Sequence, residues 1–424
     1  MVKKVCGKKY YEKVKMKYSK NIHPICQSLM IASAAIVVGF PTAHAADSIT
    51  EAFTGCTPYV DLNLRFEAAQ QDNALEDAEA LTLRTRLGYK TGSFNGFSAV
   101  LELEDSREVF GVDNFSVPPA GVRPGEFTVI ADPETTELDQ GYIQYSGGGF
   151  TAKLGRQVIA LDGQRFIGHV GWRQDRQTFD AFSLTYSPTE SIKLTGAQLT
   201  QRNRIFAEEA DIESEDTLLN AAFTTSFGKF VAYAYLLEVD NDVDNSLDTI
   251  GISFSGSAPV GSNKILYTAE FASQEIDDAI DTEYLWLEGG VSFSGITAKV
   301  GLESLGSDDG IGGFAAPLGT LHKFNGWTDQ FLTTPAEGLN DFYVSATGKV
   351  GGGTWLAAYH SFRSDEDAEG GFDDLGEEIN LQYVRPFGKN YAIGVKYGSY
   401  SAGDAVFGKV DADKFWFWLN AKFQ

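Results

Sequence analysis

Apolar and polar residues alternate with a period of two along most of this sequence, and this pattern constrains the fold more than any other feature. In residues 59–67 the apolar positions are Val60, Leu62, Leu64 and Phe66, and polar residues lie between them. In residues 81–90 the polar face carries Thr82, Arg84, Arg86, Gly88 and Lys90. A strand of this kind has one face against an apolar phase and the other against water.

The sequence beyond residue 45 has no apolar segment long enough to cross a membrane as a helix, since its longest uncharged, strongly apolar run is about 230–237. Lipid accepts only helices and closed barrels, because every backbone polar group must be paired inside the protein. The 45 Gly and 13% aromatic residues, against only 12 Pro and 3 Met, suit a turn-rich β structure.

Strand-like segments recur along the chain, about eighteen in all. After the first two they begin near residues 97, 138, 150, 177, 192, 217, 230, 248, 264, 283, 295, 340, 354, 377, 391 and 413. Their connections alternate between short turns with Gly or Pro and long loops, which we place at 105–135, 158–175, 205–216, 240–247, 275–282, 304–338, 365–376 and 401–411. Short turns on one rim and long loops on the other are typical of bacterial outer-membrane barrels. A secreted β-sandwich or β-propeller is the alternative, but it has no reason to segregate its connections in this way.

The first 45 residues are set apart by their composition. Residues 1–20 carry eight Lys, residues 28–40 are apolar but too short to span a bilayer, and Ala43-His44-Ala45 supplies small residues for cleavage. We expect residues 1–45 to be a cleaved signal peptide and residues 46–424 to form the barrel. Cys56 is then the one remaining cysteine, which leaves no disulfide framework and no cysteine metal site.

The last segment has the character of a closing strand. Phe415, Phe417, Leu419 and Phe423 alternate with polar residues and with Trp416 and Trp418. An aromatic residue at the end of the last strand is the usual assembly signal of outer-membrane barrels, and here Gln424 follows it. We therefore expect contacts with outer-membrane lipid and lipopolysaccharide, and with the barrel-assembly machinery.

The charge of the chain excludes one class of partner and is unevenly distributed. The formal net charge is -24, so we expect no nucleic-acid partner. Four segments hold 23 acidic residues and no Lys or Arg: 207–216, 240–248, 275–283 and 364–378. All four fall in long connections, which predicts an acidic outer mouth.

Arginine is concentrated in the first half of the chain. Arg65, Arg84, Arg86 and Arg202 fall on the polar faces of their strands, and so in the lumen of the predicted barrel. Two interpretations are open, and both can hold together. Guanidinium groups in a wet lumen can bind solute carboxylates transiently. Alternatively, they pair with lumen acids and hold the wall together, the candidates being Asp61, Glu67, Glu102 and Glu104.

Residues 154–175 read Leu-Gly-Arg-Gln-Val-Ile-Ala-Leu-Asp-Gly-Gln-Arg-Phe-Ile-Gly-His-Val-Gly-Trp-Arg-Gln-Asp. This stretch resembles the signature of the alginate export family of outer-membrane porins, with weaker echoes at 62–67 and 81–89. The resemblance implies an eighteen-stranded barrel and an arginine-lined conduit for a uronate polymer. The polymer-facing candidates that it carries over are Arg65, Arg84, Arg86, Arg156, Arg165 and Arg173. Arg202 joins them through its place on a polar strand face.

Enzyme signatures are weak in this sequence. No nucleophile-elbow or P-loop pattern is present, and the histidines beyond residue 45 lack helical metal-ligand spacing. His360 is predicted to be a wall residue. Residues 240–245 begin like a calcium loop but lack its Gly and its Glu, so we expect a solvated acidic loop. We expect no enzyme activity and no cofactor.

We therefore predict an all-β protein, a transmembrane antiparallel β-barrel of about eighteen strands in the bacterial outer membrane. Its expected function is passive transport of an anionic saccharide polymer or oligomer, with alginate the solute that the resemblance implies. A general or other-solute diffusion porin is the alternative. An outer-membrane enzyme of the lipase type, which would need a Ser/His pair within hydrogen-bond reach, and a surface adhesion protein are further alternatives.

Overall fold

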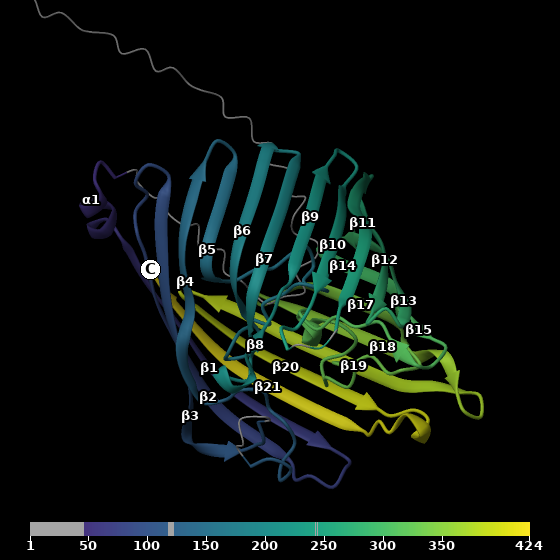
Figure 1. Cartoon of the computed structure of the whole chain (residues 1–424). Coiled ribbons are helices and arrows are strands. Elements are labelled where there is room, and N and C mark those ends of the chain that lie inside the picture. Colours follow the sequence, from purple (N-terminus) through teal and green to yellow (C-terminus); the bar gives the residue numbers. More distant parts are fainter. Residues whose placement is uncertain (1–45, 118–122, 242, 244) are drawn as a thin grey trace, which may run out of the picture.

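A closed antiparallel β-barrel makes up nearly all of the described part of the chain (Figure 1). The computed structural model describes residues 46–117, 123–241, 243 and 245–424, so the predicted signal peptide lies outside the described residues. Among these residues, no helix is long and apolar enough to cross a membrane.

Eighteen strands form the barrel wall, and each pairs antiparallel with its neighbours, as predicted. They are β1 (Thr57–Gln71), β2 (Ala78–Lys90), β3 (Phe97–Asn114), β4 (Thr135–Gly147), β5 (Phe150–Gln157), β6 (Thr178–Thr189), β7 (Ile192–Asn203), β9 (Thr217–Thr224), β10 (Lys229–Leu237), β11 (Leu247–Val260), β12 (Asn263–Ile276), β13 (Ile280–Phe293), β14 (Ile296–Leu305), β17 (Leu339–Val350), β18 (Gly353–Ala368), β19 (Phe372–Phe387), β20 (Tyr391–Ser401) and β21 (Ala412–Phe423). The two-residue strand β8 (Ile212–Glu213) pairs with β7, and β15 (Ser307–Asp308) pairs with β16 (Gly312–Gly313). The barrel closes where β1 pairs with β21, from Val60 opposite Phe423 to Gln71 opposite Ala412.

Side chains alternate between the two faces of the wall as the sequence pattern requires. Ile143 and Leu154 on the outer face are 60% and 64% exposed, as expected of residues that lipid covers. Arg65 and Arg84 on the inner face are buried. The polar face of each strand therefore points into the barrel, and the apolar face points outward.

The connections divide between two rims. Turns such as 148–149, 190–191 and 351–352 form the short-turn rim, and the remaining connections form the long-loop rim. The short helix α1 (Ile49–Thr54) lies at the short-turn rim, where the Gly92 amide donates to the Ala52 carbonyl at 2.8 Å. In barrels of this class the short turns face the periplasm.

Several strands extend further at the long-loop rim than the sequence indicated. The predicted loop 105–135 is strand as far as Asn114, and the predicted loop 365–376 shrinks to the turn 369–371 between β18 and β19. Cross-strand pairing explains the difference, because Asn114 lies opposite Glu79 and Ala368 opposite Phe372. Beyond the lipid both strand faces meet water, so acidic residues do not end the strand.

Two long connections turn into the barrel. The first inward loop, residues 158–177, joins β5 to β6, and the second inward loop, residues 306–338, joins β14 to β17. Phe166 of the first loop packs on Tyr284 of the wall and on Phe314 of the second loop, with ring centroids 5.1 and 5.7 Å apart. Apolar side chains of both loops belong to one core with inward-facing wall residues, so the loops occupy part of the interior.

The two inward loops are joined by backbone contacts that need a glycine. The Gly168 amide donates to the Leu318 carbonyl at 2.8 Å, and the Thr320 amide donates to the Gln164 carbonyl at 2.9 Å. A Cβ at Gly168 would lie 2.3 Å from the Thr320 hydroxyl, so only glycine permits this approach. These two hydrogen bonds fasten the inward loops to each other.

Candidate functional site

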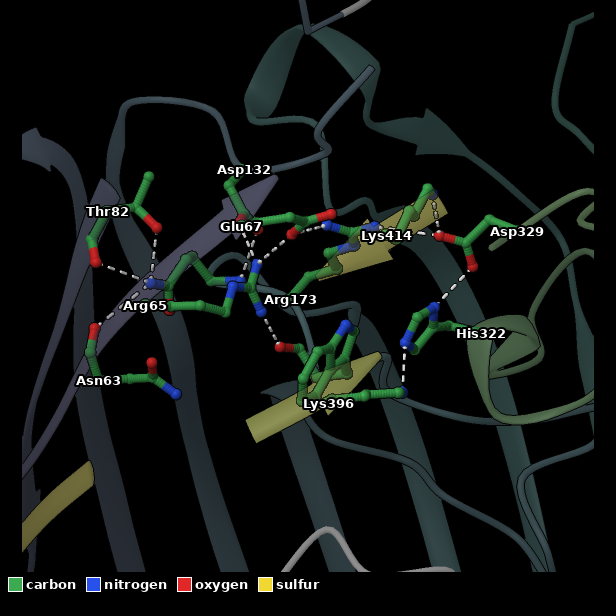
Figure 2. A network of polar contacts seen from close by, with 12 residues as sticks. Asn63, Arg65, Glu67, Thr82, Asp132, Arg173, His322, Asp329, Lys396 and Lys414 are labelled. Carbon is green, nitrogen blue, oxygen red and sulfur yellow. Dashed lines mark hydrogen bonds and ion pairs between the residues drawn. The ribbon is translucent and has the colours of Figure 1, made fainter. Parts of the chain in front are cut away.

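Arg65 of β1 connects the wall to two loops. Its guanidinium donates to the Asp132 carboxylate and to the Trp172 carbonyl (Figure 2). Asp132 lies in the connection between β3 and β4 and also accepts the Gln174 amide at 3.0 Å. Burial opposes ionisation of Asp132, but the charges of Arg65 and Arg173 hold its pKa below the usual value. Asp132 is therefore ionised, and its carboxylate binds both Arg65 and the Gln174 amide.

Arg173 of the first inward loop lies beside Arg65 in the same network. It donates to Glu67 of β1 at 2.8 Å and to Asp329 of the second inward loop at 3.3 Å. Asp329 also accepts from Lys414 of β21 at 2.7 Å. Figure 2 shows these charges arranged as one chain across the seam between β1 and β21. Each positive group thus has a carboxylate partner, as buried charges require.

His322 continues this chain to β20. Its Nδ1 lies 2.6 Å from Asp329, and its Nε2 lies 2.7 Å from the Lys396 ammonium. Because an ionised carboxylate can only accept, Nδ1–H donates to Asp329, and Nε2 of the neutral ring accepts from Lys396. Burial, with the nearby charges of Lys396 and Arg173, lowers the pKa of His322 to about 3. The ring therefore remains neutral at ordinary pH.

Indole rings enclose this part of the network. The Trp172 ring stacks on His322 with centroids 5.2 Å apart, and Trp416 meets the same ring edge-on. The Lys396 ammonium lies 3.8 Å from the centre of the Trp327 ring and 4.4 Å from that of Trp172. Such cation–π contacts stabilise an ammonium that has left bulk water.

Glu378 of β19 binds the backbone of the second inward loop. It accepts from the amides of Trp327 and Thr328 and from the Thr328 hydroxyl, the last at 2.6 Å. Gly326 has φ 86°, and a Cβ there would lie 2.3 Å from the carboxylate. A glycine is therefore required for this anchor.

The arginines predicted from the sequence are all paired with carboxylates. Arg165 donates to Glu303 at 2.6 Å and Arg84 to Asp61 at 2.9 Å, while Arg86 contacts Glu104. Arg202 makes two bonds to Asp216, at 2.8 and 2.6 Å, and Arg156 makes two to Asp180, at 2.8 and 3.2 Å. These contacts agree with the interpretation that the arginines hold the wall together. Their direct contact with solute stays a prediction.

The structure gathers these seven arginines into three groups. Arg65 and Arg173 share the network of Figure 2, and Arg84 and Arg86 lie on the neighbouring strand β2. Arg165 reaches the far wall at β14, where Asn325 also contacts it at 3.1 Å. Arg156 of β5 pairs with Asp180 of β6, and Arg202 of β7 pairs with Asp216, which directly precedes β9.

Sequence reasoning missed several members of the site. His322 and Asp329 come from the second inward loop, Lys396 from β20 and Lys414 from β21, and no local sequence pattern predicts that they meet. Arg176 was visible, since it directly follows the quoted stretch 154–175, and it binds Asp139 at 2.9 Å and contacts Glu102.

The described residues offer little for catalysis. In them His322 and His360 contact carboxylates, and no histidine side chain hydrogen-bonds a serine. Nor does this part of the chain contain a group of three or more His, Cys, Asp or Glu side chains arranged to hold a metal. The site is a set of ion pairs that narrows the barrel.

Comparisons with known proteins agree with this architecture. A family model described as alginate export matches residues 60–275, which include all seven arginines. Among proteins with curated functions, none matches the sequence.

Solved structures of outer-membrane proteins share the fold at low sequence identity. Pseudomonas aeruginosa OccK9 (OpdG) superposes with a TM-score of 0.70 at 14% identity, over 88% of this chain and 99% of that one. Acinetobacter baumannii OccAB1 gives 0.71 at 10% identity, over 90% and 99%. Pseudomonas aeruginosa OpdK, solved with vanillate, gives 0.69 at 12% identity, over 86% and 98%.

Proposed function

Because this chain belongs to the alginate export family, we propose that its barrel passes an anionic saccharide, alginate or its oligomers, across the outer membrane. The chain is an integral outer-membrane porin, since its family and its structural neighbours are channels and not enzymes. The identity of the solute is the part of this function that we propose.

The observation that carries the proposal is the pairing of every predicted arginine with a protein carboxylate. A solute carboxylate can replace Asp or Glu at a guanidinium without leaving the guanidinium unpaired, where the displaced protein carboxylate can turn to water. A neutral sugar cannot, and leaving a buried charge without its partner costs about 3–5 kcal/mol. The Arg156–Asp180 pair is partly open to water, with side chains 16% and 31% exposed, so we assign the first exchange to it.

A second candidate is diffusion of small carboxylates. It is favoured by the two inward loops, which occupy part of the interior. OpdK, which shares this fold, was solved with vanillate, itself a carboxylate. Both candidates need the same positive groups, and they differ in the length of solute that fits.

The outer surface supports the proposed lipid and assembly partners. Phe415, Phe417 and Leu419 of β21 face outward and are 38–43% exposed, and the strand ends at Phe423 beside β1. We propose that lipid covers this face and that the assembly machinery binds this strand before the barrel closes. Lipopolysaccharide would meet the long-loop rim.

Single-channel recording in planar bilayers tests the proposal. We expect the wild-type channel to prefer Cl⁻ to K⁺ in a salt gradient, and uronate tetramers to block it while neutral glucose tetramers do not. The double variant Arg156→Gln with Asp180→Asn keeps hydrogen-bonding groups but removes both charges. Block should weaken roughly tenfold, the result of losing about 1.4 kcal/mol of binding.

The control is the double variant Arg107→Gln with Asp105→Asn, which removes a similar pair at the exposed rim. It should leave block unchanged. Block that is strongest for uronate monomers and vanishes for tetramers would favour the small-carboxylate candidate. Cation preference without any uronate block would exclude both.

A further inference from the structure

Eight lysines lie near the short-turn rim, each within three residues of the end of its strand. They are Lys90, Lys153, Lys193, Lys229, Lys264, Lys299, Lys349 and Lys422, from β2, β5, β7, β10, β12, β14, β17 and β21. Three residues of strand span about 10 Å. These side chains therefore form a band around the barrel at one depth, which we call the lysine ring.

Strand register places the lysine ring on the inner face. Lys153 lies opposite Gln144 and Ser183, and Lys229 lies opposite Thr224 and Ser255. The neighbours of these lysines point outward, as Leu154 at 64% and Phe230 at 46% exposure illustrate. Because side chains alternate, the lysines face the lumen.

The lysine ring is only partly neutralised. Lys229, Lys299 and Lys422 pair with Asp162, Glu288 and Asp61, at 2.6, 2.9 and 2.9 Å. Within the described part of the chain, four others have no carboxylate within ion-pair distance: Lys153, Lys193, Lys264 and Lys349. All four are at least partly exposed, whereas the Arg65 and Arg173 side chains are 1% and 6% exposed. Accessible positive charge in the lumen is therefore concentrated at this rim.

The opposite rim carries the opposite charge. The described residues of the four acidic segments lie there with most of their carboxylates exposed, and the exposed arginines of that rim, such as Arg107 and Arg363, are already paired. The two rims of such a barrel are separated by an apolar band about 25 Å tall. Salt screens charges over about 8–10 Å, so each mouth has its own potential.

We infer that the lysine ring is the first binding site of an anionic solute, which enters this channel chiefly through its short-turn mouth. The inference rests on the proposed function and adds the place where the solute is captured. Mouth charge of this kind raises the rate of association of an opposite charge by about 10-fold or more. Flexible lysine stems around one band can contact successive carboxylates of one chain. Net transport through a passive channel still follows the concentration gradient of the solute, and the lysine ring determines where the solute first binds.

Block from each side of a bilayer tests the inference. Uronate tetramers added to the short-turn side should block the wild-type channel about tenfold more often than tetramers added to the other side at 0.1 M KCl. The difference should shrink at 1 M KCl, where screening extends only about 3 Å. The orientation of each channel in the bilayer is determined with a channel that carries Glu369→Cys at the long-loop rim and Cys56→Ser. An impermeant thiol reagent added to one side reacts with Cys at position 369 only when the long-loop rim faces that side.

The test variant replaces Lys153, Lys193, Lys264 and Lys349 together by Gln. In this variant, tetramers added to the short-turn side should block more slowly, and block from the other side should not change, so the difference between the two sides should disappear. Arg at the same four positions should restore that difference. Arg385→Gln with Lys389→Gln removes two charges at the same rim outside the lumen. This control should behave as wild type. Equal block from both sides of the wild-type channel overturns the inference and leaves the proposed function intact.

Rectification in KCl alone tests the ring without any saccharide. A pore with a positive inner mouth and a negative outer mouth should conduct better at one polarity, and the four Gln changes should reduce that asymmetry. If uronates fail to block from either side while rectification depends on the lysines, the proposed solute is wrong and the lysine ring stands as an anion site. A linear wild-type current would overturn the ring as well.

Discussion

Arg173 of the first inward loop and Glu67 of the first strand form a buried ion pair at 2.8 Å. This pair fastens a loop that enters from the long-loop rim to a wall strand 106 residues earlier in the chain. Asp329 and Lys414 extend the same contact to the second inward loop and to the last strand. A charged contact thus joins both loops to the seam of the barrel.

Removal of one partner of this pair should release the loops. Arg173→Gln removes the nearer cation of buried Glu67 and leaves only Arg65, at 3.7 Å, so docking of the loops should weaken by up to about 3–5 kcal/mol. Open-channel current noise should rise accordingly. The combined variant Glu67→Gln with Arg173→Gln should be less affected than Arg173→Gln alone, because no buried charge is stranded. Arg363→Gln, whose pair is half exposed, should change stability by no more than about 1 kcal/mol.

The orientation of the wall can be tested at two adjacent residues of β4. Ile143 faces outward near the middle of the apolar band, whereas Gln144 faces the lumen. Ile143→Arg should cost about 2–4 kcal/mol of folding free energy, and Gln144→Arg should cost little. Urea-induced unfolding in detergent micelles measures both. Equal effects of the two changes would contradict the register.

Acid should loosen the loops through His322. Its pKa is about 3 in the folded protein and near 6.5 when the loop is released, so neutral His322 stabilises docking above pH 6.5. That stabilisation should decline as the pH falls from 6.5 toward 3. Asp329, whose pKa lies well below its usual value, loses its contribution only below about pH 3.9.

Measurement of open-channel current noise as a function of pH separates the contribution of His322 from that of Asp329. The wild-type channel should become noisier between pH 6.5 and 4, and His322→Gln should be noisy throughout with a weaker pH dependence in this window. Of the other groups that face the ring, Arg173 and the indoles of Trp172 and Trp416 do not titrate there. A wild-type channel whose noise is constant from pH 7 to 4 would argue against this role of His322.

The second inward loop should set the conductance. Leu305 and Leu339 lie directly opposite each other at its two ends, so residues 308–336 can be replaced by a tight Asn-Gly turn without moving β14 or β17. Single-channel conductance should rise, because side chains such as Phe314 and Phe331 leave the interior. Deletion of the exposed turn residues 369–371 is the control and should leave conductance unchanged.

The wall of the barrel could be predicted from sequence because each strand carries its own signal. The alternation at Val60, Leu62 and Leu64 depends only on where lipid and water lie, so it needs no knowledge of other strands. The strand count and the two kinds of connection followed from the same pattern. The ends of β3 and β18 did not, since strand pairing beyond the lipid leaves no apolar alternation.

The interior of the site was only half visible for a related reason. Arg65 and Arg84 stood out because a charge on an alternating strand must face water or a partner. Their partners were harder to assign. Asp132 meets Arg65, and Asp329 meets Arg173, only after the β3–β4 connection and the two inward loops are in place, and such contacts depend on the path of the whole chain.

The pairing of β1 with β21 has a consequence for how the protein is made. Residues 57–71 are synthesised first among the strands, yet their second neighbour is residues 412–423, the last strand. Until that strand arrives, β1 presents an unpaired edge that is prone to aggregate with other chains. Once the barrel is closed, the same seam brings the start of β1 and the end of β21 to one rim. A circular permutant that joins these ends and opens at the turn 369–371 should therefore build the same wall in a different order.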